Sequence, residues 1–406
     1  MSSLVSRHAT GTRTLDGGQG RAVNDPSIAP RAVPRFADHA LMIAIIGLAL
    51  FGAVMIASAS MAFAAKNYGT PFFFVSRQLF FLGVGAVVGV FLFRLPLGVW
   101  EKYGPHMILA ALVALALVLI PGIGKEVNGS RRWIDLGVIT VQVSEAVKLL
   151  IIVYLAGYLV RRGHLVQNTF GGFLRPLVLM AVISALLLLE PDFGASVVIV
   201  GTALLMLFVA GVRFSQFAAL VAVVGSIGAL LIAMSPYRMR RFASFLDPFS
   251  DPFNSGFQLT QSLIAIGSGG VTGLGFGASV QKLDYLPEAH TDFLFAVLSE
   301  ELGLIGALTL IGVYAFIVFR CFRLSRLAEE QGNRFGSYVA LGIGIWIGLQ
   351  AFVNIGVNMG VLPTKGITLP LMSYGGSSAV VFAASFALLL RVEWEVRRCA
   401  RAEDGS

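Results

Sequence analysis

Asp292 combines the residue type and the position that acid–base chemistry needs. It stands in the stretch PEAHTDFLFAVLSEELG, residues 287–303, where a long polar segment gives way to an apolar run. Partial removal from water raises the pKa of a carboxyl group, which makes its ionised form a better general base. An ordinary helix N-cap is the alternative, because Asp at a helix start accepts N–H bonds and favours the helix dipole. Asp292 is therefore the candidate catalytic base, and capping stays open.

Other polar residues lie inside or beside apolar runs, where a charge costs about 2.5–3.5 kcal/mol on insertion scales and usually faces a cavity. Glu145 and Lys148 are three residues apart and share one helical face, so they form an internal ion pair or bind substrate. Glu300 lies two turns beyond Asp292 and either lines a cavity or pairs with a cation. Further candidates for substrate binding, chosen by position beside the apolar runs, are Arg77, Arg132, His290, Lys365, Tyr374 and Ser377.

The glycine run GSGGVTGLGFGAS, residues 267–279, could hold a phosphate through backbone N–H groups. It matches neither the P-loop nor the dinucleotide-binding fingerprint, so a flexible or re-entrant loop is the expected structure. Two cysteines exclude a disulfide framework, and a single outer histidine, His290, excludes a multi-histidine metal site there.

The composition indicates an integral membrane protein. The chain has 406 residues, is 56% hydrophobic and 13% charged, and has a mean hydropathy of +0.82. Soluble domains carry about twice that charged fraction. The net charge of +8 comes from basic residues in short connections, which is a topology signal and not a nucleic-acid-binding surface.

These features predict an all-α, polytopic fold with about ten transmembrane helices, because a bilayer core needs roughly 20 apolar residues per span. A disordered tail is expected over 1–37, a membrane domain over 38–393 and a second tail over 394–406. A large extracytoplasmic loop, residues 235–291, separates the seventh and eighth spans. The predicted spans are 40–63, 72–93, 106–121, 142–160, 176–190, 193–210, 214–234, 292–319, 337–359 and 372–391.

The distribution of Lys and Arg predicts the orientation. Segments on the side of the two termini carry 19 of these residues and segments on the opposite side carry 9, with Arg77 and Lys148 inside spans. Because cytoplasmic connections carry the excess of positive charge, both termini are expected in the cytoplasm and the long loop outside.

Several long motifs resemble the SEDS family (shape, elongation, division and sporulation). The resemblance runs from about Ala40 to Arg391 and is closer to the division branch than to the elongation branch. The motifs that carry it are NGSRRWIDLG at 128–137, EPDFG at 190–194, LDPFSDPFNSGFQLTQSLIAIGSGG at 246–270, QKLDYLPEAHTDFLFAVLSEELGLIG at 281–306 and NIGVNMGVLPTKGITLPLMSYGGSS at 354–378.

The resemblance implies a peptidoglycan glycosyltransferase that polymerises lipid II into glycan strands during septal wall synthesis in cell division. It places the family's catalytic aspartate on Asp292. It also implies a class B penicillin-binding protein as partner, with other membrane proteins of the division machinery, at the septum in the bacterial cytoplasmic (inner) membrane. Arg132, Lys148 and Lys365 are the first candidates for holding the donor pyrophosphate, ahead of Arg238, Arg240 and Arg241, and Mg²⁺ or Mn²⁺ could assist.

Two other functions fit a polytopic chain with buried charge: a lipid II flippase, and a non-catalytic scaffold of the division machinery. Polymerisation of lipid II in detergent, where no leaflet exists to flip across, separates the three.

Overall fold

The computed structural model describes residues 38–127, 130–135, 137, 140–254, 256–283, 285–363 and 366–404, with the backbone alone for 127, 170, 237, 238 and 401–404. The candidate Lys365 lies outside the described residues. So do the N-terminal residues 1–37.

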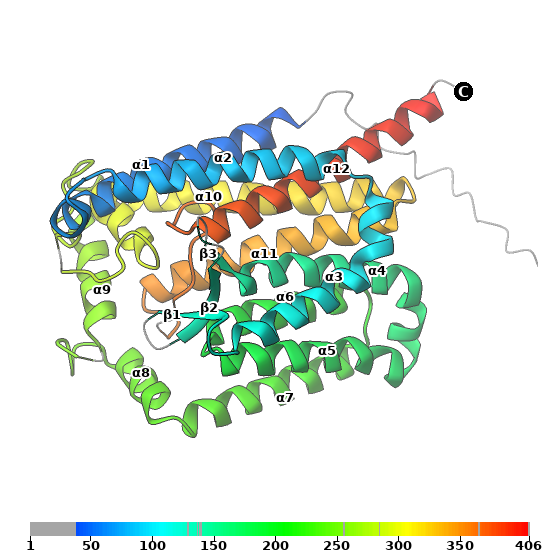
Figure 1. Ribbon diagram of the computed structural model, residues 1–406, viewed down its shortest axis with the longest axis horizontal. Coiled ribbons are helices and arrows are strands. Elements are labelled where there is room, and N and C mark those ends of the chain that lie inside the picture. Colours follow the sequence, from blue (N-terminus) through cyan, green and yellow to red (C-terminus); the bar gives the residue numbers. More distant parts are fainter. Residues whose placement is uncertain are drawn as a thin grey trace, which may run out of the picture. The chain divides into compact units, whose positions relative to one another are not determined.

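The described residues form mainly helices, which run side by side (Figure 1). The helices are α1 (His39–Tyr68), α2 (Phe73–Arg94), α3 (Leu97–Val118), α4 (Val143–Asn168), α5 (Phe170–Leu189), α6 (Phe193–Val209), α7 (Phe214–Ala233), α8 (Pro236–Leu246), α9 (Phe257–Gly269), α10 (Leu294–Glu330), α11 (Arg334–Asn358) and α12 (Gly376–Asp404). The strands are β1 (Gly124–Val127), β2 (Ser130–Asp135) and β3 (Thr140–Gln142).

Each of the ten predicted spans has a helix, namely α1 to α7 and α10 to α12. Within the described ranges, eight helices are long and apolar enough to cross a membrane; α6, with 17 residues, and α12 are not among them. The predicted all-α, multi-pass fold is confirmed. Several boundaries differ. α3 begins at Leu97, before the predicted 106, and α4 and α10 end at Asn168 and Glu330, beyond the predicted 160 and 319. α12 continues to Asp404 through the segment predicted as a tail.

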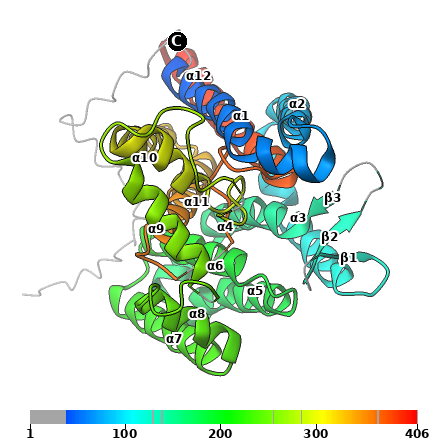
Figure 2. The same cartoon turned by 90° about the vertical axis from the view of Figure 1, so that its left-hand side faces the viewer.

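Burial separates central from peripheral helices. In the most apolar windows of α4 and α11, 78% and 72% of residues are buried, whereas in α7 none is. Figure 2, which views the helices nearly end-on, shows α4 and α11 surrounded by the others. Since α4 and α11 are enclosed by protein, polar side chains on them face other helices and not lipid.

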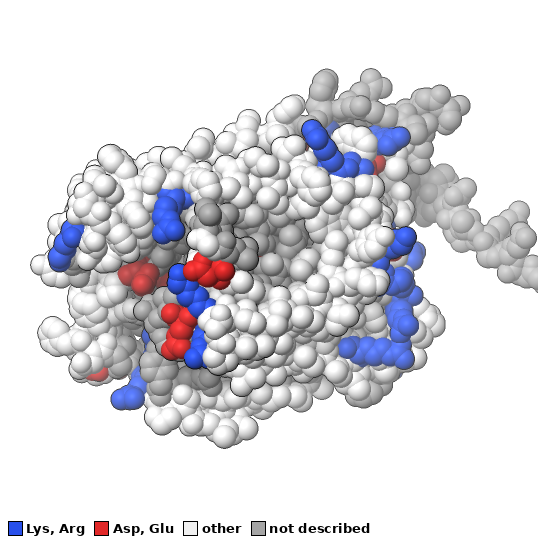
Figure 3. Space-filling view, viewed as in Figure 1, with Lys and Arg blue, Asp and Glu red and all other residues white. Residues whose placement is uncertain are grey.

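Charged side chains gather toward the two ends of the helices. On the face shown in Figure 3, a wide band without visible Lys, Arg, Asp or Glu separates two charged zones. The small sheet carries two exposed ion pairs, Lys125–Asp135 and Arg131–Glu126. An uncharged band between charged ends is the surface that a bilayer requires.

The sheet was not predicted. It is a three-stranded antiparallel sheet in the order β1–β2–β3, between α3 and α4. Val127 pairs with Ser130, so only two residues connect β1 and β2. The sequence there is Asn-Gly, which is the strongest short-range signal for a β-hairpin. The prediction of spans from hydropathy did not use it.

The long loop between α7 and α10 is also more regular than expected. It contains α8 and α9, which Figure 1 shows at one end of the bundle. Buried Ser262 of α9 donates a hydrogen bond to the carbonyl of Asn358, at the end of α11. The second half of the loop is therefore fastened to the bundle.

The glycine run closes against a kink in α10. Gly303 has φ +65°, which interrupts the helix, and the kinked carbonyls of Glu300 and Glu301 accept hydrogen bonds from the backbone N–H groups of Leu274 and Gly275. A Cβ on Gly273 would lie 2.1 Å from the carbonyl oxygen of Glu301, so only glycine permits this approach. Beyond α9, which ends at Gly269, the run is a loop packed beside α10, and the N–H groups of Leu274 and Gly275 are bonded to α10.

Candidate active site

Asp292 precedes α10, and its carboxylate is free among the described residues. The N-cap position of α10 is Phe293, with no side-chain capping bond, so the capping alternative for Asp292 is wrong. Oδ2 of Asp292 lies 2.7 Å from the point that a Cβ on Gly366 would occupy. The carboxylate therefore lies against bare backbone, and no hydrogen bond from a described residue occupies its oxygens.

Amide side chains of α11 hold the backbone at Asp292. Asn354 Nδ2 donates to the carbonyl oxygens of Asp292 (2.9 Å) and Ile367 (2.6 Å), and Asn358 Nδ2 donates to that of Asp292 (3.0 Å). Gln350, one turn earlier, donates to the carbonyl of Thr368. The spacing of four residues puts all three amides on one face of a buried helix. They fix the start of α10 and the segment beside Gly366 to the same support.

Burial and nearby charge set the protonation of Asp292. Burial is the largest influence, and with Glu288 it raises the pKa of Asp292 to about 7; Asp192 adds a smaller push in the same direction, while Arg132 and Arg241 oppose the rise. A base is most effective when its pKa is close to the working pH. Asp292 therefore has the protonation behaviour of a general base near neutral pH.

The hairpin between α5 and α6 brings a second acidic group to this region. Gly194 packs against Ile367, so the hairpin lies beside the segment that contacts Asp292. Glu190 is fully buried, and neither of its carboxylate oxygens has a partner among the described residues. Burial, followed by the charge of Asp192, raises the pKa of Glu190 to about 8, and Arg132 opposes this. Near neutral pH these influences favour the protonated, uncharged form of Glu190.

Arg132 on β2 is a predicted cation that, within the described part of the chain, lies at the site. Its guanidinium donates to the backbone carbonyls of Glu190 (3.1 Å) and Pro191 (2.7 Å), which fixes the arginine against the hairpin. Its charge lowers the pKa of Asp292 and of Glu190, so it lies within electrostatic reach of both carboxyls.

Asp192 and Ser377 tie the site's elements together. Asp192 caps α6 through the N–H of Ala195 and accepts a hydrogen bond from Ser144. Ser377, at the start of α12, donates to the carbonyl of Thr140 and accepts from the N–H of Gln142. The predicted residue Ser377 is thus engaged in joining α12 to β3.

His290 and Tyr374 form one aromatic cluster beside Asp292. The His290 ring lies 4.3 Å from that of Phe74 and 5.7 Å from that of Tyr374, and its carbonyl accepts the N–H of Tyr374. Burial lowers the pKa of His290, and the charge of Glu288 opposes this. An uncharged imidazole in an aromatic setting fits positioning of the Asp292 segment better than attraction of a phosphate.

Glu145 and Lys148 form the internal ion pair that the sequence left as an alternative. Lys148 Nζ lies 2.8 Å from Glu145 Oε1 and 3.0 Å from Gln350 Oε1, and both charged side chains are buried. The pair therefore supports Gln350, which is one of the three α11 amides, with Asn354 and Asn358, that hold the backbone around Asp292.

Glu300 and Glu301 fasten the loop that leads to Asp292. Glu300 accepts hydrogen bonds from Ser279 Oγ (2.5 Å) and the N–H of Val280 (2.9 Å). Glu301, fully buried, pairs with Lys282 at 2.7 Å and accepts from Ser58. The predicted pairing with a cation applies to Glu301, which uses Oε1 for it, while its buried Oε2 has no partner among the described residues.

The remaining candidate, Arg77, is exposed on α2, with its guanidinium 5.3 Å from the Phe73 ring centre. The described residues contain no group of three or more His, Cys, Asp or Glu that could hold a metal ion. Sequence reasoning missed Glu190, Asp192 and Gln350. The four-residue spacing of Gln350, Asn354 and Asn358 was a readable signal for the amide row.

Comparison with known proteins decides the family. The family model described as "Cell cycle protein", which covers FtsW, RodA and SpoVE, matches residues 39–398. The chain belongs to the FtsW/RodA/SpoVE family. The predicted SEDS membership is confirmed.

Individual relatives agree over most of the chain. It is 52% identical over 358 residues to "Probable peptidoglycan glycosyltransferase FtsW" of Thioalkalivibrio sulfidiphilus, covering 88% of this chain and 90% of that protein. It is 54% identical over 360 residues to the protein of that name in Nitrosococcus halophilus, covering 89% and 93%. The predicted glycosyltransferase class is confirmed at this level.

Solved structures support the fold. One chain, from "Structural coordination of polymerization and crosslinking by a peptidoglycan synthase complex", aligns with a TM-score of 0.73 and 29% identity over 89% of this chain and 98% of that one. Thermus thermophilus "Rod shape determining protein RodA" aligns with a TM-score of 0.64 and 27% identity over 88% and 97%.

Proposed function

We propose that this chain polymerises lipid II into peptidoglycan glycan strands, with Asp292 as the general base. The 4-hydroxyl of one lipid II sugar loses its proton to Asp292 and forms a bond to the anomeric carbon of the growing chain. The bond from that carbon to undecaprenyl pyrophosphate breaks, and the pyrophosphate leaves with the electron pair. The observation that carries this proposal is the Asp292 carboxylate, which has no hydrogen bond or ion pair with the described residues and whose pKa burial raises to about 7.

The leaving pyrophosphate needs positive charge, because charge that develops in the transition state is stabilised by fixed cations. Arg132 is our first candidate, since it is held rigidly within electrostatic reach of Asp292. Arg241 of α8 also acts on Asp292 and is a second. Lys365, adjacent to Gly366 in sequence, remains a candidate by position. Lys148 contributes through the α11 amides, because it is already paired with Glu145.

A divalent cation, Mg²⁺ or Mn²⁺, stays a proposal without a protein site. The described residues supply no group of three acidic, histidine or cysteine side chains for it. The reaction steps proposed above use no metal ion.

We further propose that the chain works in the bacterial inner membrane at the division septum, with both termini cytoplasmic and Asp292 on the outer side. One structural relative comes from a peptidoglycan synthase complex that couples polymerisation to crosslinking. By analogy, the partner is a class B penicillin-binding protein, joined by other membrane proteins of cell division. Co-purification with that protein and faster polymerisation in the pair are the expected results.

The function is tested with purified chain and partner in detergent, supplied with lipid II. Glycan strands should appear on a gel in the presence of a transpeptidase inhibitor. A flippase or a scaffold would produce no strands, because detergent leaves no leaflet to cross and a scaffold forms no bond. Absence of strands from a folded, partner-bound chain would reject the proposal.

A further inference from the structure

The break at Gly303 divides α10 into a part enclosed by protein and a part of membrane-crossing length. The residues before the break, Leu294–Glu301, are all buried. Beyond it, no Asp, Glu, Lys or Arg occurs before Arg320. Residues 304–319 extend roughly 24 Å as a helix, which is close to the hydrocarbon thickness of about 30 Å. The break therefore lies near one edge of the hydrocarbon and Arg320 near the other.

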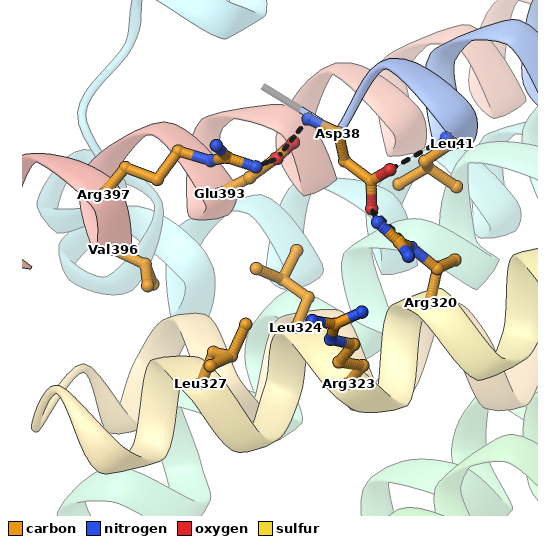
Figure 4. Close-up of a pocket in the computed structure, with 9 residues that line it drawn as sticks. All are labelled: Asp38, Leu41, Arg320, Arg323, Leu324, Leu327, Glu393, Val396 and Arg397. Carbon is orange, nitrogen blue, oxygen red and sulfur yellow. Dashed lines mark hydrogen bonds and ion pairs between the residues drawn. The ribbon is translucent and has the colours of Figure 1, made fainter. Parts of the chain in front are cut away.

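Charge and tryptophan mark the edge at Arg320. Arg320 pairs with Asp38, and Figure 4 shows this pair where α10 meets the start of α1. Glu393 of α12 accepts the backbone N–H of Asp38 (2.7 Å), so the adjacent Trp394 lies at the same level. Trp394 is exposed, and the Arg391 guanidinium lies 4.4 Å from its ring centre. Exposed tryptophan beside arginine is typical of a membrane–water interface, so the opposite edge falls near the break in α10.

Backbone hydrogen bonds hold the loop after α9 at the level of this break. The carbonyl of Gly270 accepts the N–H of Leu304 (2.9 Å). The carbonyl of Val271 accepts the N–H of Ile305 (3.2 Å), and Leu274 donates its N–H to α10 from the other side of the turn (3.0 Å). An unpaired backbone group is costly next to hydrocarbon, and here α10 already pairs these groups.

The side chains of this loop are apolar and exposed. Val271, Leu274 and Phe276 are 62%, 48% and 56% exposed. No Asp, Glu, Lys or Arg occurs between Asp251 and Lys282, so the sequence around these side chains carries no charge. A cluster of exposed apolar side chains usually marks a surface that is covered in the working protein.

The apolar surface of the loop adjoins the apolar surface of α10. Leu304, Ile305 and Leu308, which follow the break, are exposed. Because Val271 is bonded to Ile305, the two sets of side chains are neighbours at the edge of the hydrocarbon. Figure 2 shows α10 at the periphery of the bundle. The exposed apolar side chains of its crossing part therefore face lipid.

We propose that the loop 270–277 is inserted into the bilayer leaflet on the Asp292 side, with the side chains of Val271, Leu274 and Phe276 among the acyl chains next to the headgroups. Three features favour lipid as the occupant: the depth of the loop, its lack of charge and its continuity with the lipid-facing surface of α10. The segment 235–291, predicted as an extracytoplasmic loop, then has a membrane-inserted part between α9 and Lys282. This inference goes beyond the proposed function, which assigns no role to these side chains.

The test measures the depth of single spin labels in the full chain, reconstituted in nanodiscs of phosphatidylcholine and phosphatidylglycerol. The labelled variants are Val271→Cys and Leu274→Cys, in a chain whose exposed Cys399 is changed to Ser; Cys321 is buried. Both positions bond to α10 through backbone atoms, so the substitutions should leave the loop folded. Gel filtration of each labelled chain checks this.

Two further positions calibrate the measurement. Phe253→Cys is the matched control, because Phe253 is an exposed apolar residue of the same predicted loop that lies two residues after Asp251. Leu308→Cys is the reference for a lipid-facing position. Each label is tested for collision with oxygen, which dissolves in lipid, and with a neutral nickel chelate, which stays in water.

We expect oxygen to collide several times more often than the nickel chelate with labels at 271 and 274, as at 308, because apolar oxygen concentrates in hydrocarbon. At 253 the chelate should collide more often. Values at 271 and 274 that match those at 253 would place the loop in water and overturn the proposal. Low collision with both reagents at 271 and 274 would show that protein covers the loop, and would overturn the choice of lipid as the occupant.

Discussion

At Asp292, burial and charge act in opposite directions on one carboxyl group. Burial and Glu288 favour the protonated form, and Arg132 and Arg241 favour the ionised form. The resulting pKa of about 7 leaves a useful fraction ionised at neutral pH while keeping the carboxylate basic enough to accept a proton.

The first prediction is a pH profile. Because the base must be ionised, kcat/KM for polymerisation should rise tenfold per pH unit below about 7 and level off above it. The measurement is the polymerisation rate between pH 5.5 and 8.5. A profile that is flat across this range, or one centred near pH 4, would contradict a buried base.

The second prediction concerns stability. The contribution of Asp292 to stability should fall as pH rises, whereas the activity should increase. The folded-state pKa of Asp292 is raised above its unfolded value of about 3.9. The folded state therefore binds more protons between these pKa values, and this residue's contribution to stability falls as pH rises from about 4 to 7. Relative to wild type, Asp292→Asn should gain thermal stability as pH rises through that window and gain no more above it. Melting curves in detergent at pH 5 and 8 measure this; a constant difference would oppose it.

The third prediction uses the bare backbone beside the carboxylate. A methyl group at residue 366 would lie 2.7 Å from Asp292 Oδ2, so Gly366→Ala must displace the base. We expect polymerisation to fall at least tenfold while expression stays normal, since a small misplacement of a catalytic group is costly. Gly267→Ala is the matched control, because it adds a methyl group on α9 where nothing lies within 4 Å. Similar activity of the two variants would contradict the claim that the catalytic carboxylate of Asp292 lies against the backbone of Gly366.

At the scale of elements, the loop between α9 and α10 is held by buried polar contacts. The pair Lys282–Glu301 is almost completely buried, and breaking one side of such a pair leaves an uncompensated charge. The fourth prediction is that Lys282→Met lowers kcat strongly with little change in KM, because the loop positions Asp292. Adding Glu301→Gln should restore part of the activity.

Lys125→Met is the control for that series. It breaks the ion pair with Asp135, in which the Lys125 and Asp135 side chains are 49% and 39% exposed, and such exposed pairs contribute little to stability. Equal loss of activity in Lys125→Met and Lys282→Met would mean that burial of the second pair has no special effect.

Hydropathy predicted the helices that are long and apolar enough to span a bilayer. It did not predict the short polar elements, whose structure depends on contacts with the rest of the protein. The spans were found because each needs a long apolar run. The sheet of β1 to β3 and the helices α8 and α9 are short, polar segments whose form depends on the bundle beneath them.

The same distinction applies to the candidate site. Asp292 was found because its motif and position are local. The engagement of Lys148 with Gln350, and the approach of Glu190 to Arg132, join residues far apart in the chain. No periodicity in a single sequence reports such contacts.

At the scale of the molecule, orientation decides whether Asp292 meets a substrate outside the cytoplasm. The excess of Lys and Arg predicts that the end of α10 is inside and the loop after α8 is outside. The fifth prediction is that a cysteine replacing exposed Ser250 reacts with an impermeant thiol reagent in intact cells. A cysteine replacing exposed Glu330 should react only after lysis, in a chain whose exposed Cys399 is changed to Ser. Labelling of residue 330 and not of 250 would reverse the orientation.

The most direct measurement is lipid II polymerisation by Asp292→Asn with its partner in detergent. Asn keeps the size of the side chain, and because Phe293 and not Asp292 is the N-cap of α10, the helix start should be unaffected. If Asp292 is the base, normal expression and partner binding should accompany a rate reduced by about 10² or more. Polymerisation at close to the wild-type rate would contradict the assignment of Asp292.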